Sequence, residues 1–146
     1  AVNGGGIRYN ATGKTLTLEG GSLTGNNATG NGGAVYSAVA VTLNGTVAFT
    51  NCNAYAKATT TSTSYSAYAY GGAIYATAIT ENGTTNYTLC KAETDATTNS
   101  NAYGGAVYAT GLVTLNGTSK ILAYVLSCSA AAILYVSVVR RTTFFL

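Results

Sequence analysis

The stretch "YGGAIYA" at residues 70–76 decides the fold, because close copies of it stand at two other places in the chain. The copies read "NGGAVYS" at 31–37 and "YGGAVYA" at 103–109. Each copy places two glycines, an alanine, a branched aliphatic residue and a tyrosine in the same order. Internal repetition with a period of a few tens of residues is typical of solenoids and related arrays.

Each copy opens a longer unit. A segment like "VTLNGT" follows the glycine pair, and a segment that ends in Cys-x-Ala closes the unit. The Asn-Gly-Thr triplets begin at Asn44, Asn82 and Asn116, and the closing cysteines are Cys52, Cys90 and Cys128. The chain therefore reads as one domain over 1–146, with units at 4–28, 32–54, 71–92, 104–130 and a partial unit at 131–146.

The links between units vary in length far more than the units themselves, which have 22–27 residues. Residues 55–70 form the longest link and residues 93–103 the next, and both are expected to be loops. Constant bodies with variable links are the mark of a solenoid, and Asn-Gly is a strong turn signal. We expect an all-β fold, a right-handed parallel β-helix of about four and a half coils with three short strands each.

Stacked coils place equivalent residues in columns about 4.8 Å apart. One predicted column is aliphatic and faces the interior: Ile7, Val35, Ile74, Val107 and Leu134. The next column faces outward, with Arg8 below Tyr36, Tyr75, Tyr108 and Tyr135. At the turn, Asn44, Asn82 and Asn116 stack above Glu19. A fourth column, in the core, holds Leu23, Phe49, Tyr87 and Val125.

Glu81 breaks this pattern, because it stands where the other units have Leu18, Leu43 and Leu115. Either the coil shifts locally or the carboxyl group reaches solvent. The overall composition, in contrast to Glu81, is consistent with the stack: only 8% of residues are charged and none is proline. Columns of like charge repel, and proline removes hydrogen bonds between strands.

The same composition disfavours several classes of function. The net charge is +3, but the Lys and Arg residues are scattered, whereas nucleic-acid binding needs a clustered basic patch. No apolar run reaches the roughly 20 residues of a membrane-spanning helix. The chain starts without Met or a signal peptide, which suggests a mature product or an internal fragment.

The cysteine column leaves three alternatives open. We favour buried thiols over a disulfide between neighbouring coils, which would leave one of the three cysteines unpaired. A metal is disfavoured, because a straight column does not converge on four ligands and the chain has no His. No cofactor is expected.

An enzyme is also disfavoured. Polysaccharide cleavage needs paired carboxylates, and Glu93 and Asp95 are the only two acids close together in sequence. No histidine is present to activate a hydroxyl nucleophile.

The longest link is rich in tyrosine among Thr and Ser, a composition that suits adaptable contact surfaces. Its tyrosines either contact a ligand or pack on their own solenoid: Tyr55, Tyr65, Tyr68 and Tyr70. Of six Asn-x-Ser/Thr triplets, those at Asn10 and Asn27 are the better candidates for glycosylation, because the Asn-Gly-Thr triplets are explained as turns.

The pairing of "GGAIY" or "GGAVY" with a preceding "FTNCNA" or "LTGNNA" resembles the polymorphic outer-membrane-protein repeat, whose motifs are GGA[ILV] and FxxN. The stretch "LTGNNATGNGGAVY" at 23–36 is close to that pattern, and "YTLC" at 87–90 departs from it at both ends. The resemblance covers roughly residues 4–135. It implies a β-helix in a secreted or surface-exposed protein, with adhesion and self-association, and it carries over no catalytic residue.

The ends of such a stack show unpaired strand edges, which invite another chain. Head-to-tail stacking that does not close gives a filament. We therefore expect a secreted, non-enzymatic subunit of an extracellular filament. The alternative is an adhesin or autotransporter passenger fragment that binds a host or glycan ligand through its loops.

Overall fold

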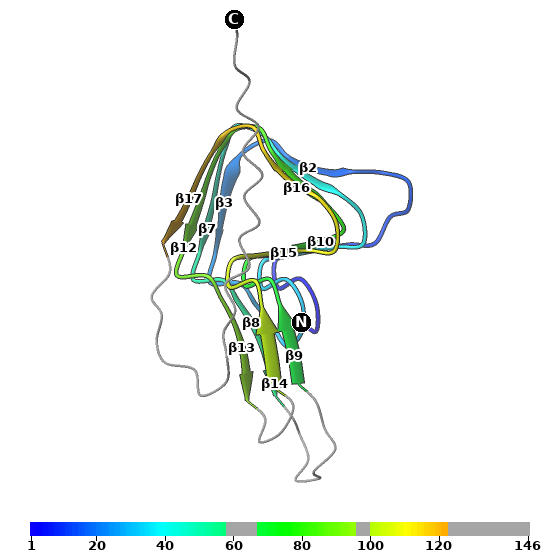
Figure 1. The fold of residues 1–146 in the computed structure, drawn as a ribbon, viewed down its shortest axis with the longest axis vertical. Coiled ribbons are helices and arrows are strands. Elements are labelled where there is room, and N and C mark those ends of the chain that lie inside the picture. The colour runs from blue at the N-terminus through cyan, green and yellow to red at the C-terminus, as the bar shows by residue number, and fades with distance from the viewer. Residues whose placement is uncertain (58–66, 96–99, 123–146) are drawn as a thin grey trace, which may run out of the picture.

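The computed structural model describes residues 1–57, 67–95 and 100–122, which form an all-β parallel β-solenoid of four stacked coils (Figure 1). Coil 1 holds β1 (Ile7–Tyr9), β2 (Leu16–Leu18), β3 (Gly21–Thr24) and β4 (Asn27–Ala28). Coil 2 holds β5 (Val35–Ser37), β6 (Val41–Leu43), β7 (Thr46–Thr50) and β8 (Asn53–Lys57). Coil 3 holds β10 (Ile74–Ala76), β11 (Ile79–Glu81), β12 (Thr84–Thr88) and β13 (Lys91–Asp95). Coil 4 holds β15 (Val107–Ala109), β16 (Val113–Leu115) and β17 (Thr118–Leu122).

Equivalent strands of successive coils pair in parallel and build one sheet for each side of the solenoid. Three four-stranded sheets enclose a triangular body: β1-β5-β10-β15, β2-β6-β11-β16 and β3-β7-β12-β17 (Figure 1). A further sheet, β4-β8-β13, leaves this body at one corner. Coils 1 to 3 therefore contain four strands each, and the expectation of three strands per coil was too low.

The two long links are not simple loops. Strands β9 (Ala67–Tyr70) and β14 (Ser100–Tyr103) stand within them and pair with each other in parallel. Together with β8 and β13 they form an arm that projects from the triangular body (Figure 1). The two layers of the arm meet over a small alanine core: Ala54, Ala56, Ala67, Ala69 and Ala92. The alternation of alanine with larger residues in "NAYAK" and "AYAY" places every alanine on one face of its strand.

The predicted inner columns are confirmed over coils 1 to 3. Val35 pairs with Ile7 and Ile74, and Ile74 pairs with Val107. Phe49 pairs with Leu23 and Tyr87, and these two aromatic rings stack at 5.2 Å. Leu134 and Tyr135 lie outside the described residues.

The prediction of Val125 in the Phe49 column is wrong, because Tyr87 pairs with Ile121. The fourth unit has four more residues between its Asn-Gly-Thr triplet and its cysteine than the second and third units have. The prediction aligned the third strand on the cysteines, whereas the strands are in fact aligned on the triplets.

The glycine pair at the start of each unit serves two purposes. Gly71 has φ +65°, which L-residues with a side chain rarely adopt. A Cβ atom on Gly72 would lie 1.9 Å from the carbonyl oxygen of Gly105 in the next coil. The first glycine therefore turns the chain, and the second allows the coils to approach.

Candidate functional sites on the ladders and the arm

The outer tyrosines form two stacked columns that meet where the arm leaves the body. Tyr36 and Tyr75 stack at 5.2 Å between ring centroids, and Tyr75 and Tyr108 at 5.5 Å. Tyr70 and Tyr103, on the arm, stack at 5.2 Å, and the Tyr70 ring lies 4.8 Å from that of Tyr108. Burial raises the pKa of Tyr70 and Tyr75, and the neighbouring phenols add to this effect. Stacking covers the ring faces within each column, so the columns present mainly ring edges and hydroxyl groups to solvent.

The tyrosines of the longest link do not form one contact loop. Tyr55 lies on β8, whereas Tyr68 and Tyr70 lie on β9, and Tyr65 is outside the described residues. The alanines of both strands face the arm core. Tyr55 therefore points to the opposite side of the arm from Tyr68 and Tyr70.

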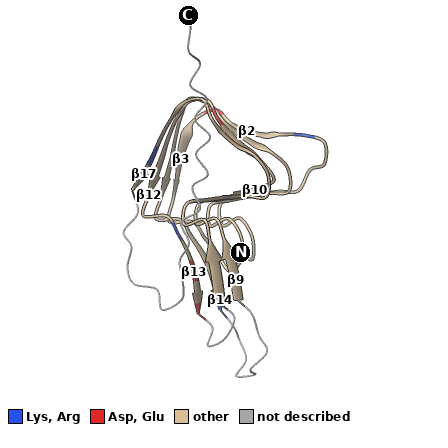
Figure 2. Ribbon diagram, in the orientation of Figure 1, with Lys and Arg blue, Asp and Glu red and all other residues tan. Residues whose placement is uncertain are grey.

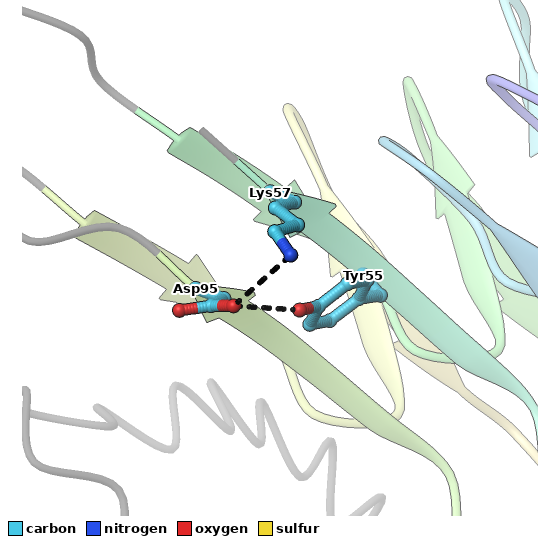
Figure 3. Close-up of polar contacts among 3 residues, drawn as sticks. All are labelled: Tyr55, Lys57 and Asp95. Atoms are coloured by element: carbon cyan, nitrogen blue, oxygen red, sulfur yellow. Dashed lines mark hydrogen bonds and ion pairs between the residues drawn. The ribbon is translucent and has the colours of Figure 1, made fainter. Parts of the chain in front are cut away.

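The outer face of β8 and β13 carries a polar cluster (Figure 3). The Tyr55 hydroxyl donates to Asp95 Oδ2 at 3.1 Å, and Lys57 Nζ lies 4.0 Å from the same oxygen. Desolvation, followed by this hydrogen bond and the Asp95 charge, raises the pKa of Tyr55. Glu93 on the same strand pairs with Lys91 at 2.9 Å. Both carboxylates thus lie within ion-pair distance of a lysine on the same sheet, and pairs this exposed contribute little to stability.

The predicted asparagine column is confirmed as a directional chain of hydrogen bonds. Asn116 Nδ2 donates to Asn82 Oδ1 at 2.9 Å, and Asn82 Nδ2 donates to Asn44 Oδ1 at 3.0 Å. Asn44 Nδ2 donates to both carboxylate oxygens of Glu19 at 3.2 Å. The amide dipoles point the same way, and a residue that only accepts ends the chain at coil 1.

Glu81 follows neither of the two predicted alternatives. The coil keeps its register, since Glu81 pairs with Leu43 and Leu115, and the residue is only 2% exposed. The Tyr87 hydroxyl donates to its Oε1 at 2.5 Å, and the Ser119 hydroxyl donates to its Oε2. The sequence showed that Glu81 was out of place, but Tyr87 and Ser119 were not recognised as its partners.

The cysteine column is confirmed for Cys52 and Cys90, which are buried free thiols; Cys128 lies outside the described residues. Cys52 Sγ donates to Leu23 O at 3.4 Å, and Cys90 Sγ donates to Phe49 O at 3.5 Å. The neighbouring Cys90 thiol lowers the pKa of Cys52 to about 7, and the Cys52 thiol together with burial raises the pKa of Cys90. No group of three or more His, Cys, Asp or Glu residues that could hold a metal occurs in the described part of the chain.

The candidate glycosylation sites differ from the turn asparagines. Asn10 and Asn27 are exposed, although Asn27 Nδ2 donates to Gly25 O at 3.1 Å. The amide nitrogens of Asn44, Asn82 and Asn116 are all donors in the asparagine column.

Charged side chains are sparse over the described residues, and Figure 2 shows them on a few short segments.

The class of protein follows from this geometry: the chain is a parallel β-solenoid repeat protein, in which equivalent residues of successive coils lie in columns. Comparisons with protein-family models, with curated proteins and with solved structures found no match. Across the residues that the structure describes, no helix is long and apolar enough to cross a membrane.

Proposed function

We propose that this chain is a secreted, non-enzymatic structural protein, a subunit of an extracellular filament or surface fibre in which β-solenoids stack end to end. The observation that carries the proposal is the edge of coil 1. Its strands β1 to β4 are the last strands of their sheets on that side among the described residues. Its core residues Ile7, Leu16, Leu18 and Leu23 are only partly buried, whereas their coil 2 equivalents are fully buried.

A further coil on this edge would complete both the packing and the hydrogen bonding. Val35, Val41, Leu43 and Phe49 of coil 2 are no more than 1% exposed, because a coil covers each side of them. Apolar area removed from water contributes about 25 cal/mol per Å². The motif resemblance to the polymorphic outer-membrane-protein repeat supports a location outside the cell and self-association.

The test is the oligomeric state of the purified chain with its edge open or blocked. Leu16 N donates to Ala40 O of coil 2, and successive residues of a strand direct their N–H groups to opposite sides, so the Thr17 N–H faces the open edge. We expect concentration-dependent linear particles in sedimentation and negative-stain microscopy. Thr17→Pro should suppress them, because proline removes an edge donor, and Thr17→Val should not. Discrete single particles of the unmodified chain at every concentration would refute the filament.

A second candidate function, an adhesin that binds a glycan or another host ligand, is favoured by the arm. The variable links build a projecting element whose one face carries exposed Tyr68 beside Tyr70 and Tyr103. Tyrosines combined with small polar residues suit ligand contact.

Point variants test this candidate better than deletion of 55–70, because the deletion would remove strand β9 and most of β8. Binding on a glycan array that disappears in Tyr68→Ala/Tyr103→Ala and persists in Tyr55→Ala would establish an adhesin surface on that face. Binding that is the same in all three proteins would exclude this face of the arm.

A further inference from the structure

The interior of coil 3 is polar at three positions where the coils below it are apolar. Glu81, Thr85 and Tyr87 occupy the columns that hold Leu43, Val47 and Phe49 in coil 2. Thr85 is fully buried and its hydroxyl oxygen has no hydrogen-bond partner among the described residues. Buried polar groups cost stability unless they are hydrogen-bonded, so these three polar residues need a reason beyond packing.

The Glu81 carboxyl group takes one hydroxyl donor from its own coil and one from the next. Tyr87 lies six residues further along the chain, so its contact with Oε1 forms within coil 3. Ser119 belongs to β17 of coil 4 and supplies the donor for Oε2. The column position of Ser119 is held by Val47 in coil 2 and by Gly21 in coil 1, and neither of these residues has a hydroxyl group. Only coil 4, in its observed register, satisfies Glu81.

The sequence of the fourth unit allows a second register for its third strand. The distance from the triplet to the cysteine is four residues longer there, so the extra residues can stand before the strand or after it. If they stood before it, Ala123 would lie over Thr85 and Val125 over Tyr87. A shift by four residues keeps the same side chains inside, and Ala123 and Val125 are both apolar. Hydrophobicity alone does not favour the observed strand, which turns Ser119 inward.

We infer that the cluster of Glu81, Tyr87 and Ser119 selects the register in which coil 4 stacks on coil 3. In the shifted register Glu81 Oε2 faces a methyl group and loses its donor. An unsatisfied buried acceptor disfavours that arrangement by about fivefold or more. The device matters in a chain of near-identical coils, because mispairing is a characteristic failure of repeat proteins.

Hydrogen exchange followed by NMR on the intact chain tests the inference. The Thr118 amide donates to Gly83 O at 2.9 Å in the observed register. In the shifted register residues 118–121 would precede the strand, so protection of this amide reports the observed register. The amides of β16 report whether coil 4 is folded at all. The key variant, Glu81→Leu/Tyr87→Phe/Ser119→Val, copies the side chains of coil 2.

We expect the triple variant to keep protection in β16 and to lose at least about fivefold at Thr118, since both registers become populated. Glu81→Gln retains hydrogen-bonding groups at both positions and should keep the wild-type protection. Unchanged protection at Thr118 in the triple variant would overturn the inference.

A matched pair decides the question if the triple variant fails to fold. Ser119→Ala removes the hydroxyl group, whereas Ser119→Thr keeps it at the same position. Protection of Thr118 should fall in the first variant and remain in the second. Equal protection in the two would show that the hydroxyl group does not select the register.

Discussion

One residue in each of the first three coils turns the chain from the third strand to the fourth, and it does so with positive φ. These residues are Gly25 (φ 68°), Asn51 (φ 52°) and Leu89 (φ 54°). Each donates its backbone N–H to the coil above, at 2.8 to 2.9 Å. Glycine and asparagine adopt this conformation readily, but a leucine there is strained. The stacking of the corners, rather than the local sequence, therefore holds Leu89 in place.

Replacement of Leu89 by asparagine should stabilise the protein. Relief of a left-handed conformation contributes about 1–2 kcal/mol, and loss of the half-buried leucine side chain offsets part of it. We expect a net gain of about 0.5–1 kcal/mol in the free energy of unfolding by urea. Thr88→Asn, one residue earlier in a regular strand, is the control and should give no gain. A Leu89→Asn protein less stable than the parent would show that packing outweighs strain at this corner.

Tyr87 should make the protein sensitive to alkaline pH. Burial, and then the Glu81 carboxylate, raise the pKa of Tyr87 well above its usual value. In the unfolded chain the phenol ionises near pH 10, so above that pH the unfolded state gains about 1.4 kcal/mol per pH unit from this group. Tyr87→Phe should be less stable at neutral pH, because Glu81 loses a donor, but its stability should fall less steeply between roughly pH 10 and 11. If the free energies of unfolding of the two proteins, measured by urea denaturation, fell equally steeply with pH, this account would be contradicted.

At the scale of the elements, the glycine-pair corners determine how closely the coils approach. A Cβ atom at Gly72 meets the backbone of Gly105 and of Lys91, which cannot move aside without parting the strands. The same crowding occurs at Gly33, where the nearest atom would be Gly72 O at 2.1 Å. The close approach of neighbouring backbone, including that of the next coil, therefore requires glycine at these positions.

Gly72→Ala should be strongly destabilising, by about 3 kcal/mol or more, because overpacking against backbone has no soft partner. Gly13→Ala is the matched control. Gly13, unlike Gly72, has positive φ, and no atom lies within 4 Å of the position that a Cβ atom would take there. It should cost only about 1 kcal/mol from backbone strain. Similar melting temperatures for the two variants would argue against close approach as the role of Gly72.

At the scale of the whole molecule, neutral columns rather than ion pairs hold the stack together. The described residues contain two ion pairs, both on the arm, and at least one partner in each is more than half exposed. Most side-chain contacts between the coils of the body are aliphatic, aromatic and amide. Such contacts are insensitive to screening.

The stability of the fold should therefore change little with salt. We expect the free energy of unfolding to vary by less than about 1 kcal/mol between roughly 0.05 and 0.5 M NaCl, since exposed ion pairs contribute little. Urea denaturation at several salt concentrations checks this. A steep decline with salt would show that the sparse charges matter more than the columns.

The sequence by itself determined the repeating coil, the order of its segments and the residues of most columns. The columns of Ile74 and Tyr75 could be predicted from the two-residue period of a strand, and the column of Asn82 from its turn motif. These signals are local and recur in each unit. The arm escaped prediction because its strands stand among residues typical of loops, and because alanine, which fills its core, is not typical of strands.

Only the tertiary structure decided where the four extra residues of the fourth unit go and what becomes of Glu81. Both questions depend on contacts between successive coils, and either register of β17 satisfies the local pattern. A hydroxyl group from Ser119 reaches a carboxyl group that would otherwise be buried with one donor, and that contact exists only once the coils have stacked.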